Sequence, residues 1–452
     1  MLEVIWSIAA FIVALGVLVS FHEFGHFWVA RRLGVKVLRY SVGFGRPLWL
    51  RRGADGVEYV IAAVPLGGYV KMLDEREAEV PAGEAHRAFN RQGVWTRIAI
   101  VAAGPLANFL MAVVAYWIVF VVGIPGHKPL VDVPPAGSVA AQAGLQRGDE
   151  VIAVNGAATP TYGALRTALI DQALAGEALE LSTRRQEALR VVTLPPGGAR
   201  LDPEYLFEDL GVRQYRPAGP LVLTYIEPGT SAEQAGLKAG DRVVRQNGEA
   251  IDQLHAWRDW IAARPGQVVE FEIRRGGETV RLSAILSSRE DRGRSIGFLG
   301  AGVSVDVPAA VWDNLAAKHR LSVWAAVPAA AAETARMSLL TLKFLYRMVL
   351  GDVSVKNISG PIQIAQFAGY TASSGLVSFL FFIAIMSVSL AVLNLLPVPV
   401  LDGGHLLYYV VELVKGSPLS DRAQAVGQQV GLTLLIALMG LAFYNDILRL
   451  ID

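Results

Sequence analysis

Four long stretches of the chain contain no Asp, Glu, Lys or Arg. They are residues 4–21, 98–124, 376–401 and 426–444. A helix rises about 1.5 Å per residue, so about 20 apolar residues cross the hydrocarbon core of a bilayer. Because lipid offers no partners to backbone groups, such stretches fold as helices. The sequence therefore predicts four transmembrane helices. The last one is weaker, since it carries Gln428 and Gln429, and a buried core helix is its alternative.

Composition adds soluble domains to the four helices. The 452 residues are 53% hydrophobic, which is high for a soluble protein, but 18% are charged, which is high for a purely membrane one. A net charge of +1 gives no support to nucleic-acid binding. The chain has no cysteine, which excludes disulfides and thiolate metal sites. Imidazole and carboxylate groups remain as metal ligands.

The first apolar stretch runs directly into the H-E-x-x-H sequence His22-Glu23-Phe24-Gly25-His26. Residues four apart lie on one side of a helix, so both imidazoles can bind one Zn²⁺. Glu23 is placed as the base for a zinc-bound water. The position predicts hydrolysis inside or at the edge of a membrane. A structural histidine pair and the apolar core of a signal peptide are the alternatives, although Glu3 replaces the positive charge that a signal peptide needs.

Charge in the first loop predicts the orientation of the helices. Residues 27–97 carry twelve Lys and Arg, whereas Lys128 stands alone near the opposite ends of the first two stretches. The positive-inside rule therefore places this loop in the cytoplasm and both termini outside. Residues from about 126 to 320 are then exported, and the H-E-x-x-H sequence lies towards the cytoplasmic side.

The exported segment contains a duplication. Residues 143–156 and 235–248 are identical at eight of fourteen positions, and each contains Leu-x-x-Gly-Asp and an Asn-Gly turn. An offset of about 90 residues indicates two compact domains rather than a solenoid. The pattern resembles PDZ domains of the bacterial protease type, which bind extended peptides or their C-termini by strand addition. Two spacer domains that only restrict access are the alternative.

A third metal ligand is sought on the cytoplasmic side, where the third stretch ends. Asp402 and His405 follow it, beside a break rich in proline and glycine. A carboxylate at this depth is costly unless it is paired, and a metal cation is a natural partner. A simple helix cap is the alternative for Asp402.

The two motifs together resemble the site-2 family of intramembrane metalloproteases, over essentially the whole chain. They are H-E-x-x-H at residues 22–26 and N-x-x-P-x-P-x-L-D-G at residues 394–403. The resemblance implies that His22, His26 and Asp402 bind zinc and that Glu23 is the general base. It implies that Asn394 contacts the substrate backbone or the oxyanion, with His405 outside the metal shell. The implied substrate is a single-span membrane protein, such as an anti-sigma factor trimmed outside in an envelope stress response.

The cytoplasmic loop suggests how a substrate is held. Residues 38–45 and 57–64 are strand-like and flank a turn signal, which predicts a β-hairpin. In the family such a hairpin dips into the membrane beside the zinc, where an edge strand can pair with an unwound substrate. Four glycines are expected to allow close backbone approach there, namely Gly43, Gly45, Gly67 and Gly68. An ordinary cytoplasmic hairpin is the alternative.

The predicted fold is a polytopic α-helical membrane protein with a membrane-associated β-hairpin and two periplasmic α+β PDZ domains, in the bacterial inner membrane. Its expected segments are helices at 1–30, 97–125, 375–401 and 426–447, a hairpin loop at 31–96, PDZ domains at 126–218 and 219–309, membrane-surface helices at 310–374 and a cytoplasmic loop at 402–425. The 310–374 helices have packing on the second PDZ domain as an alternative. A transporter and a catalytically dead PDZ scaffold are the competing functions.

Overall fold

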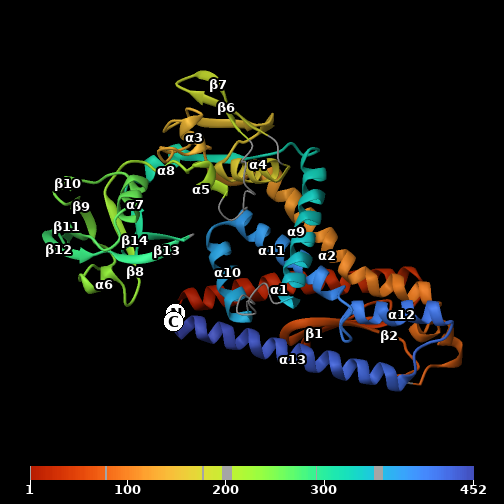
Figure 1. Cartoon of the computed structure of the whole chain (residues 1–452). Helices are drawn as coiled ribbons and strands as arrows, with labels where there is room; N and C mark the ends of the chain where they lie inside the picture. Colours follow the sequence, from red (N-terminus) through yellow and green to blue (C-terminus); the bar gives the residue numbers. More distant parts are fainter. Residues whose placement is uncertain are drawn as a thin grey trace. The chain divides into compact units, whose positions relative to one another are not determined.

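The computed structural model describes residues 2–76, 79–175, 178–195, 206–291, 293–350 and 360–451. Its elements fall into two compact units, Met1–Ile124 with Arg320–Asp452, and Pro125–His319 (Figure 1). The first unit is helical with one small sheet. The second is rich in strands.

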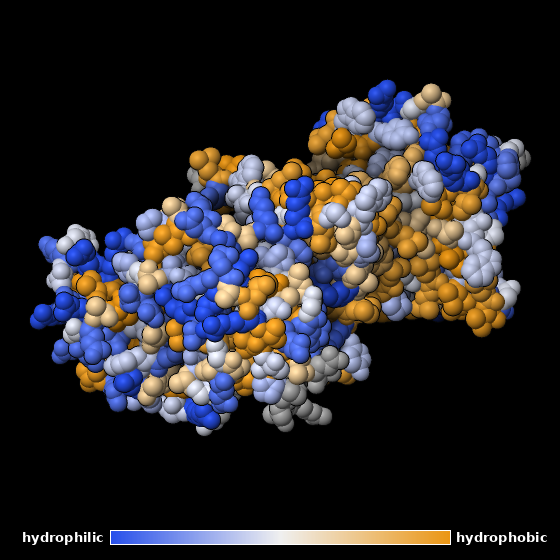
Figure 2. All heavy atoms as spheres, turned by 90° about the horizontal axis from the view of Figure 1, so that it is seen from above, coloured by the Kyte–Doolittle hydropathy of each residue, from blue (hydrophilic) through white to orange (hydrophobic). Residues whose placement is uncertain are grey.

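Four helices of the first unit are long and apolar enough to cross a membrane, as predicted. They are α1 (Leu2–Arg32), α2 (Val94–Val122), α11 (Leu376–Asn394) and α13 (Asp421–Ile451). Helix α2 packs against both α1 and α11. Hydrophobic residues cover much of the helical part in Figure 2. Large apolar side chains such as Leu106 and Ile436 are more than half exposed, as suits surfaces that face lipid.

Three further helices complete this unit. They are α9 (Ala326–Val349), α10 (Pro361–Ser373) and α12 (Asp402–Lys415). Helix α9 packs along α2 and α11, and α10 packs on α1. These two helices from the 310–374 segment thus have protein partners in the helical unit, and their place at the membrane surface stays a prediction. Residues 351–359 lie outside the described part.

The segment at 402–425 was expected to be a loop, and the structure corrects this. Its first fourteen residues form helix α12, which ends at the left-handed Gly416. Apolar residues on one side of α12 supply the reason, because Tyr409 is buried and α12 packs on α2.

The cytoplasmic loop contains strands β1 (Val37–Arg52) and β2 (Glu58–Met72), followed by the short 3₁₀ helices η1 (Ala82–Arg87) and η2 (Phe89–Arg91). The expected hairpin is present, but its pairing is more extensive. Residues 39–42 pair with residues 58–61 and also with residues 68–71, while residues 49–52 pair with residues 58–61. The two strands thus fold into four paired stretches, whose outer edges are residues 47–52 and 68–72.

The second unit holds two domains with a common order of elements, as the duplication predicts. The first contains α3 (Val139–Gln142), β4 (Glu150–Val154), β5 (Ala157–Ala158), α4 (Tyr162–Ala175), β6 (Leu179–Arg185), β7 (Ala188–Leu194) and α5 (Leu206–Leu210). The second contains β8 (Leu221–Ile226), α6 (Ser231–Gln234), β9 (Arg242–Gln246), β10 (Glu249–Ala250), α7 (Leu254–Ala262), β11 (Val268–Arg275), β12 (Glu278–Ile285), β13 (Ser287–Asp291), β14 (Arg294–Phe298) and β15 (Ala301–Val305). Strand β3 (Ile124–His127) pairs with β16 (Ala316–His319), which follows α8 (Ala309–Leu315).

Equivalent residues of the two domains make equivalent contacts. Asn155 and Asn247 both have positive φ in their Asn-Gly turns, where each side-chain oxygen accepts a backbone N–H of the next strand. Each domain has its own apolar core. This PDZ-like arrangement and the four long helices confirm the predicted fold class. The expected junction between the domains includes residues 196–205, which lie outside the described part.

Candidate metal centre

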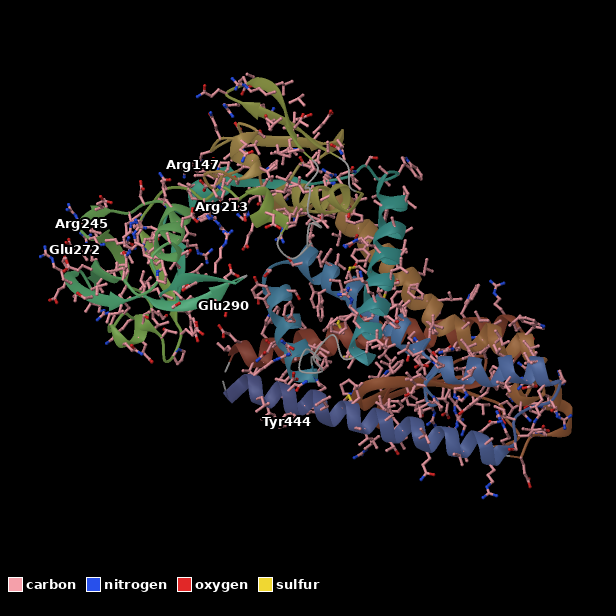
Figure 3. All side chains as sticks on the ribbon, viewed as in Figure 1. Arg147, Arg213, Arg245, Glu272, Glu290 and Tyr444 are labelled. Carbon is pink, nitrogen blue, oxygen red and sulfur yellow. The ribbon has the colours of Figure 1, made fainter. Side chains whose placement is uncertain are left out.

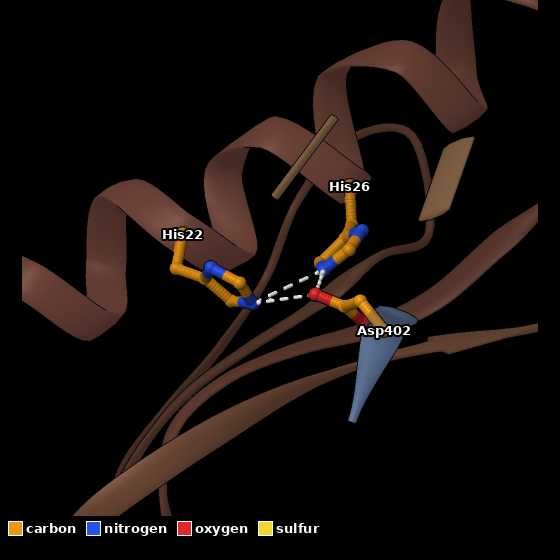
Figure 4. A group of neighbouring side chains, drawn as sticks. All are labelled: His22, His26 and Asp402. Atoms are coloured by element: carbon orange, nitrogen blue, oxygen red, sulfur yellow. Dashed lines mark hydrogen bonds and ion pairs between the residues drawn. The ribbon is translucent and has the colours of Figure 1, made fainter. Parts of the chain in front are cut away.

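Two metal-binding side chains come from one face of α1. The helix is continuous across the H-E-x-x-H sequence, so His22 and His26 lie one turn apart, with their Nε2 atoms 3.3 Å from each other. Both imidazoles point to the same side of the helix (Figure 4).

The third side chain comes from the chain's turn after α11. Asp402 is the first residue of α12, and its Oδ2 lies 3.1 Å from His22 Nε2 and 3.5 Å from His26 Nε2 (Figure 4). Zinc bonds of about 2.0–2.1 Å in a tetrahedron place ligand atoms about 3.3 Å apart. The three observed distances bracket that value. The residues therefore fit a zinc ion with one coordination position left open.

The turn that delivers Asp402 is strained. Val400 has a φ of 106°, an unusual value for a β-branched residue. Gly403 and Gly404 approach the backbone so closely that an added Cβ would lie 2.2 Å from Leu396 O and 2.5 Å from Val398 O, respectively. The L-D-G-G sequence thus permits a tight reversal that a bulkier sequence would prevent. Backbone strain of this kind is typical of functional sites.

Neighbouring groups fix how the imidazoles are presented. His26 Nδ1 lies 2.8 Å from Ile100 O, and because a carbonyl only accepts, Nδ1 carries the proton and Nε2 is free to bind a metal. Asn108 is fully buried on α2, and its side-chain amide lies 3.2 Å from His22 Nδ1 through Nδ2. When His22 Nε2 binds a metal, Nδ1 carries the proton, so the amide group is then turned with its oxygen towards Nδ1 as the acceptor. Ser387 on α11 donates to the Asn108 carbonyl at 2.7 Å. Three helices therefore share in holding the imidazoles.

Two glycines allow α1 and α2 to come this close. A Cβ on Gly104 would lie 2.2 Å from His26 Nε2, and one on Gly25 would lie 2.2 Å from Ala103 O. No role was assigned to Gly104 or to Asn108 from the sequence. Their spacing of four residues places both on the side of α2 that faces the histidines, which is the signal that was available.

The expected base, Glu23, lies beside the small sheet. It is 8% exposed, and a Cβ on Gly68 would lie 2.8 Å from its Cγ. Tyr40 on β1 donates to Ser20 O at 2.7 Å, which ties the sheet to α1. The outer edge at residues 68–72 is thus adjacent to the site.

The other expected substrate-binding glycines are placed differently. Gly43 and Gly45 have φ of 93° and 87° at the bend inside β1, and Gly43 approaches the backbone of Ala62 and Val64 rather than the metal-binding residues. Gly67 packs against the ring of Phe44. Close approach at these positions serves the folding of the sheet itself.

The remaining expected residues lie around the metal-binding group. Asn394 is the last residue of α11, is half-buried and makes no side-chain hydrogen bond to the described residues. His405 lines a cavity of about 1020 Å³ together with His26 and Asp402. Among the described residues, His22, His26 and Asp402 form the group that can hold a metal.

Comparisons with known proteins agree with this site. The model of peptidase family M50 matches residues 10–438. The chain is 43% identical over 459 residues to the regulator of sigma-E protease RseP of Escherichia coli, covering 100% of both chains, and 43% identical over 458 residues to protease RseP of Yersinia pestis, again covering 100% of both. It is 45% identical to a putative zinc metalloprotease of Xylella fastidiosa over 450 residues, which is 98% of each chain.

Among solved structures, a PDZ domain matches a part of the chain. A PDZ domain of an SdrC-like protein from Listeria monocytogenes covers 20% of this chain and 92% of its own, with 18% identity and a TM-score of 0.17, which is too slight a likeness to carry an argument. The full-length relatives and the family model are decisive. The chain belongs to peptidase family M50 and is a multi-pass membrane protein with the activity of a zinc metalloprotease.

Proposed function

We propose that this chain is an intramembrane endopeptidase that cleaves the transmembrane segment of single-span membrane proteins. The observation that carries the proposal is the convergence of His22, His26 and Asp402 within 3.5 Å, with the buried Glu23 on the same helix of membrane-spanning length. A metal-binding group on such helices suits a substrate that lies in lipid.

Zinc bound by these three side chains would polarise the scissile carbonyl and lower the pKa of a water molecule. Glu23 takes the proton from that water and delivers it to the leaving amine. Asn394 contributes a hydrogen bond to the substrate backbone or to the oxyanion, from the end of α11 next to the strained turn.

The substrate is held as an extended strand. A peptide bond in a helix is shielded by its own hydrogen bonds, so the segment must unwind before attack. Residues 68–72 form an outer edge of the sheet beside Glu23, and Tyr69 and Met72 line the cavity that contains His26. Strand addition at this edge places a scissile bond near the metal ligands. Gly67 and Gly68 keep side chains out of the way, while Gly43 and Gly45 shape the sheet.

We further propose that the site faces the cytoplasm of a bacterial inner membrane, with both termini and the PDZ-like pair in the periplasm. The twelve Lys and Arg of residues 27–97 support this orientation. The relatives named as regulators of sigma-E suggest an anti-sigma factor as substrate, already cut once on the exported side. The PDZ-like pair would exclude substrates whose exported part is still bulky, or capture their C-termini.

Zinc content and cleavage of a tagged single-span substrate, measured on purified protein, test the proposal. Glu23→Gln is expected to keep zinc and lose cleavage by a factor of about 10²–10⁴, as befits a lost general base. Asp402→Asn is expected to lose zinc as well. Glu3→Gln, at the start of the same helix, is the matched control and keeps both. Undiminished cleavage by Glu23→Gln would refute the role of Glu23 as the base, whereas a parent protein that binds zinc but does not cleave would favour a scaffold.

A further inference from the structure

The two PDZ-like domains share a cavity of about 530 Å³. The first domain contributes Tyr162 and Arg166 from α4 and Gln214 and Arg216 from the segment after α5. The second contributes residues of α7 and β15, among them His255 and Arg258. The site therefore needs both domains.

Three arginines give this cavity its charge. Arg166, Arg216 and Arg258 line it, and none has a carboxylate partner among the described residues. The guanidinium of Arg166 lies 4.9 Å from the centre of the Phe207 ring, and the guanidinium of Arg216 lies 6.0 Å from the centre of the Trp312 ring. Stacking on rings restricts where these groups can go while leaving their N–H groups available. Among the described lining residues Glu208 is the one carboxylate.

Some other arginines of the same unit, in contrast, have carboxylate partners. Arg147, Arg185 and Arg275 each bond a carboxylate of their own domain at 2.6–3.1 Å. The three cavity arginines, which have no carboxylate partner in the described part of the chain, repel one another and attract an anion. An anionic ligand is thus the missing counter-charge.

Contacts between the domains hold the cavity walls together. Arg213 donates two hydrogen bonds to Asp259 of α7, at 2.7 and 2.8 Å. His255 Nε2 lies 3.0 Å from Gln214 O and must donate to it, because a carbonyl only accepts. Both contacts join the segment after α5 to α7.

The contact of His255 also decides how a peptide can bind. The backbone carbonyl of Arg213 and the backbone N–H of Tyr215 form hydrogen bonds with residues 130–132. The backbone N–H and carbonyl of Gln214, which lies between them, therefore point in the opposite direction, towards α7. A peptide strand would be added at this edge, on the side to which the Gln214 backbone groups point. The Gln214 carbonyl there already accepts a hydrogen bond from His255. The Gln214 carbonyl is therefore already engaged within the protein, and the arginine side chains are the cationic groups that the cavity offers to a ligand.

We propose that this cavity binds acidic peptide segments through their Asp and Glu side chains. Guanidinium groups match carboxylates with paired hydrogen bonds, and two to three charges on the ligand would balance the three arginines. If the proposed function holds, the acidic segment belongs to the exported part of the substrate. The binding itself does not depend on cleavage.

The test uses the full-length Glu23→Gln protein in detergent and fluorescence anisotropy. The probe is a fluorescein-labelled octapeptide with four glutamates and an amidated C-terminus. Its counterparts replace glutamate with glutamine, one amidated and one with a free C-terminal carboxylate. The acidic amidated peptide is expected to bind at least tenfold more tightly than either glutamine peptide. Its affinity should fall steeply between 50 and 300 mM salt, because exposed charges are screened.

Substitutions assign the binding to the cavity. Arg166→Gln and Arg258→Gln should each weaken binding by about fivefold, as expected for one partly exposed charge pair. Arg258→Lys should retain most of the affinity, and Glu208→Gln should raise it. Arg245→Gln is the matched control, since Arg245 lies on β9, away from Arg213 and the domain contact (Figure 3), and it should change nothing.

Three results would overturn the proposal. They are equal binding of acidic and glutamine peptides, tightest binding of the peptide with the free C-terminus, and insensitivity to the arginine substitutions. These results leave the proteolytic function untouched, because zinc content and cleavage are measured separately. Conversely, a protein that binds the acidic peptide but never cleaves would refute the proposed function alone.

Discussion

A single methyl group at Gly104 is predicted to disrupt the metal site. In Gly104→Ala, the new Cβ would lie 2.2 Å from His26 Nε2 and 2.9 Å from His22 Cε1, whereas ordinary contacts begin at 3.4 Å. His26 would have to move by about 1.2 Å, but zinc ligand distances tolerate only about 0.2 Å. Moving α2 away is opposed by its contacts with α1 and α11.

The expected loss follows from the cost of overpacking. Forcing a methyl group into a close-packed interface costs about 1–3 kcal/mol, which corresponds to zinc binding weakened by about 5- to 150-fold. Cleavage should fall by about 100-fold or more at limiting zinc, because a displacement of about 1 Å in a catalytic group has that effect.

The assay is competition for zinc between the purified protein and a chromophoric chelator, followed by cleavage of the tagged substrate. Gly16→Ala on α1 is the matched control, since its Cβ would meet nothing within 4 Å, and it should behave like the parent. Elution as a single species in detergent shows that each variant is folded. Zinc affinity and cleavage of Gly104→Ala within twofold of the parent would refute the geometric reasoning.

Three further substitutions probe other contacts. Asn108→Ala removes the partner of a metal-binding imidazole and should weaken zinc binding by about 10- to 100-fold in the same chelator competition, with secondary structure unchanged by circular dichroism. Burial raises the pKa of Asp241, but the hydrogen bonds from Arg275 outweigh this effect and hold the pKa below its usual value. The contact between Asp241 and Arg275 therefore stabilises the second PDZ-like domain above about pH 4. This stabilisation is lost as the pH falls through the pKa of Asp241 in the folded state. Pulse proteolysis in urea at pH 6 and pH 3 should show that loss in the parent and not in Asp241→Asn, which starts less stable. Gly360→Ala places a Cβ 2.5 Å from Asp446 Oδ2 and should break the cap that Asp446 of α13 provides to α10. The expected loss of stability is about 1–3 kcal/mol, seen as faster proteolysis near residue 360. Unchanged proteolysis would show that the cap adapts.

Much of the fold follows from patterns that are local in sequence. Uninterrupted apolar stretches require helices in lipid, and the repeated Leu-x-x-Gly-Asp and Asn-Gly signals report turns that two domains share. The metal group was predictable because His22 and His26 share a motif and Asp402 ends a stretch at the same depth. Each motif is local in sequence, and the predicted topology of the helices is what joins Asp402 to the two histidines.

The features that were missed depend on pairs distant in sequence. The contact of Gly104 with His26 joins positions 78 apart, and the local spacing of Gly104 and Asn108 shows that they share a side of a helix but not which element that side faces. The second pairing of residues 39–42, with residues 68–71, likewise converts a hairpin into a broader sheet. Helix α12 was overlooked because glycines at its start suggested a break, whereas they serve close packing against the preceding turn.

The open edge at residues 68–72 has a consequence for which membrane segments this chain can digest. A ladder of N–H and C=O groups makes the same hydrogen bonds with every residue except proline, which lacks an N–H and is excluded from most strand positions. Selection at that edge would therefore be nearly blind to side-chain identity and would depend on how readily a segment leaves the helical state. Segments with glycine or β-branched residues would be favoured, and proline would be tolerated only at positions whose N–H points away from the ladder.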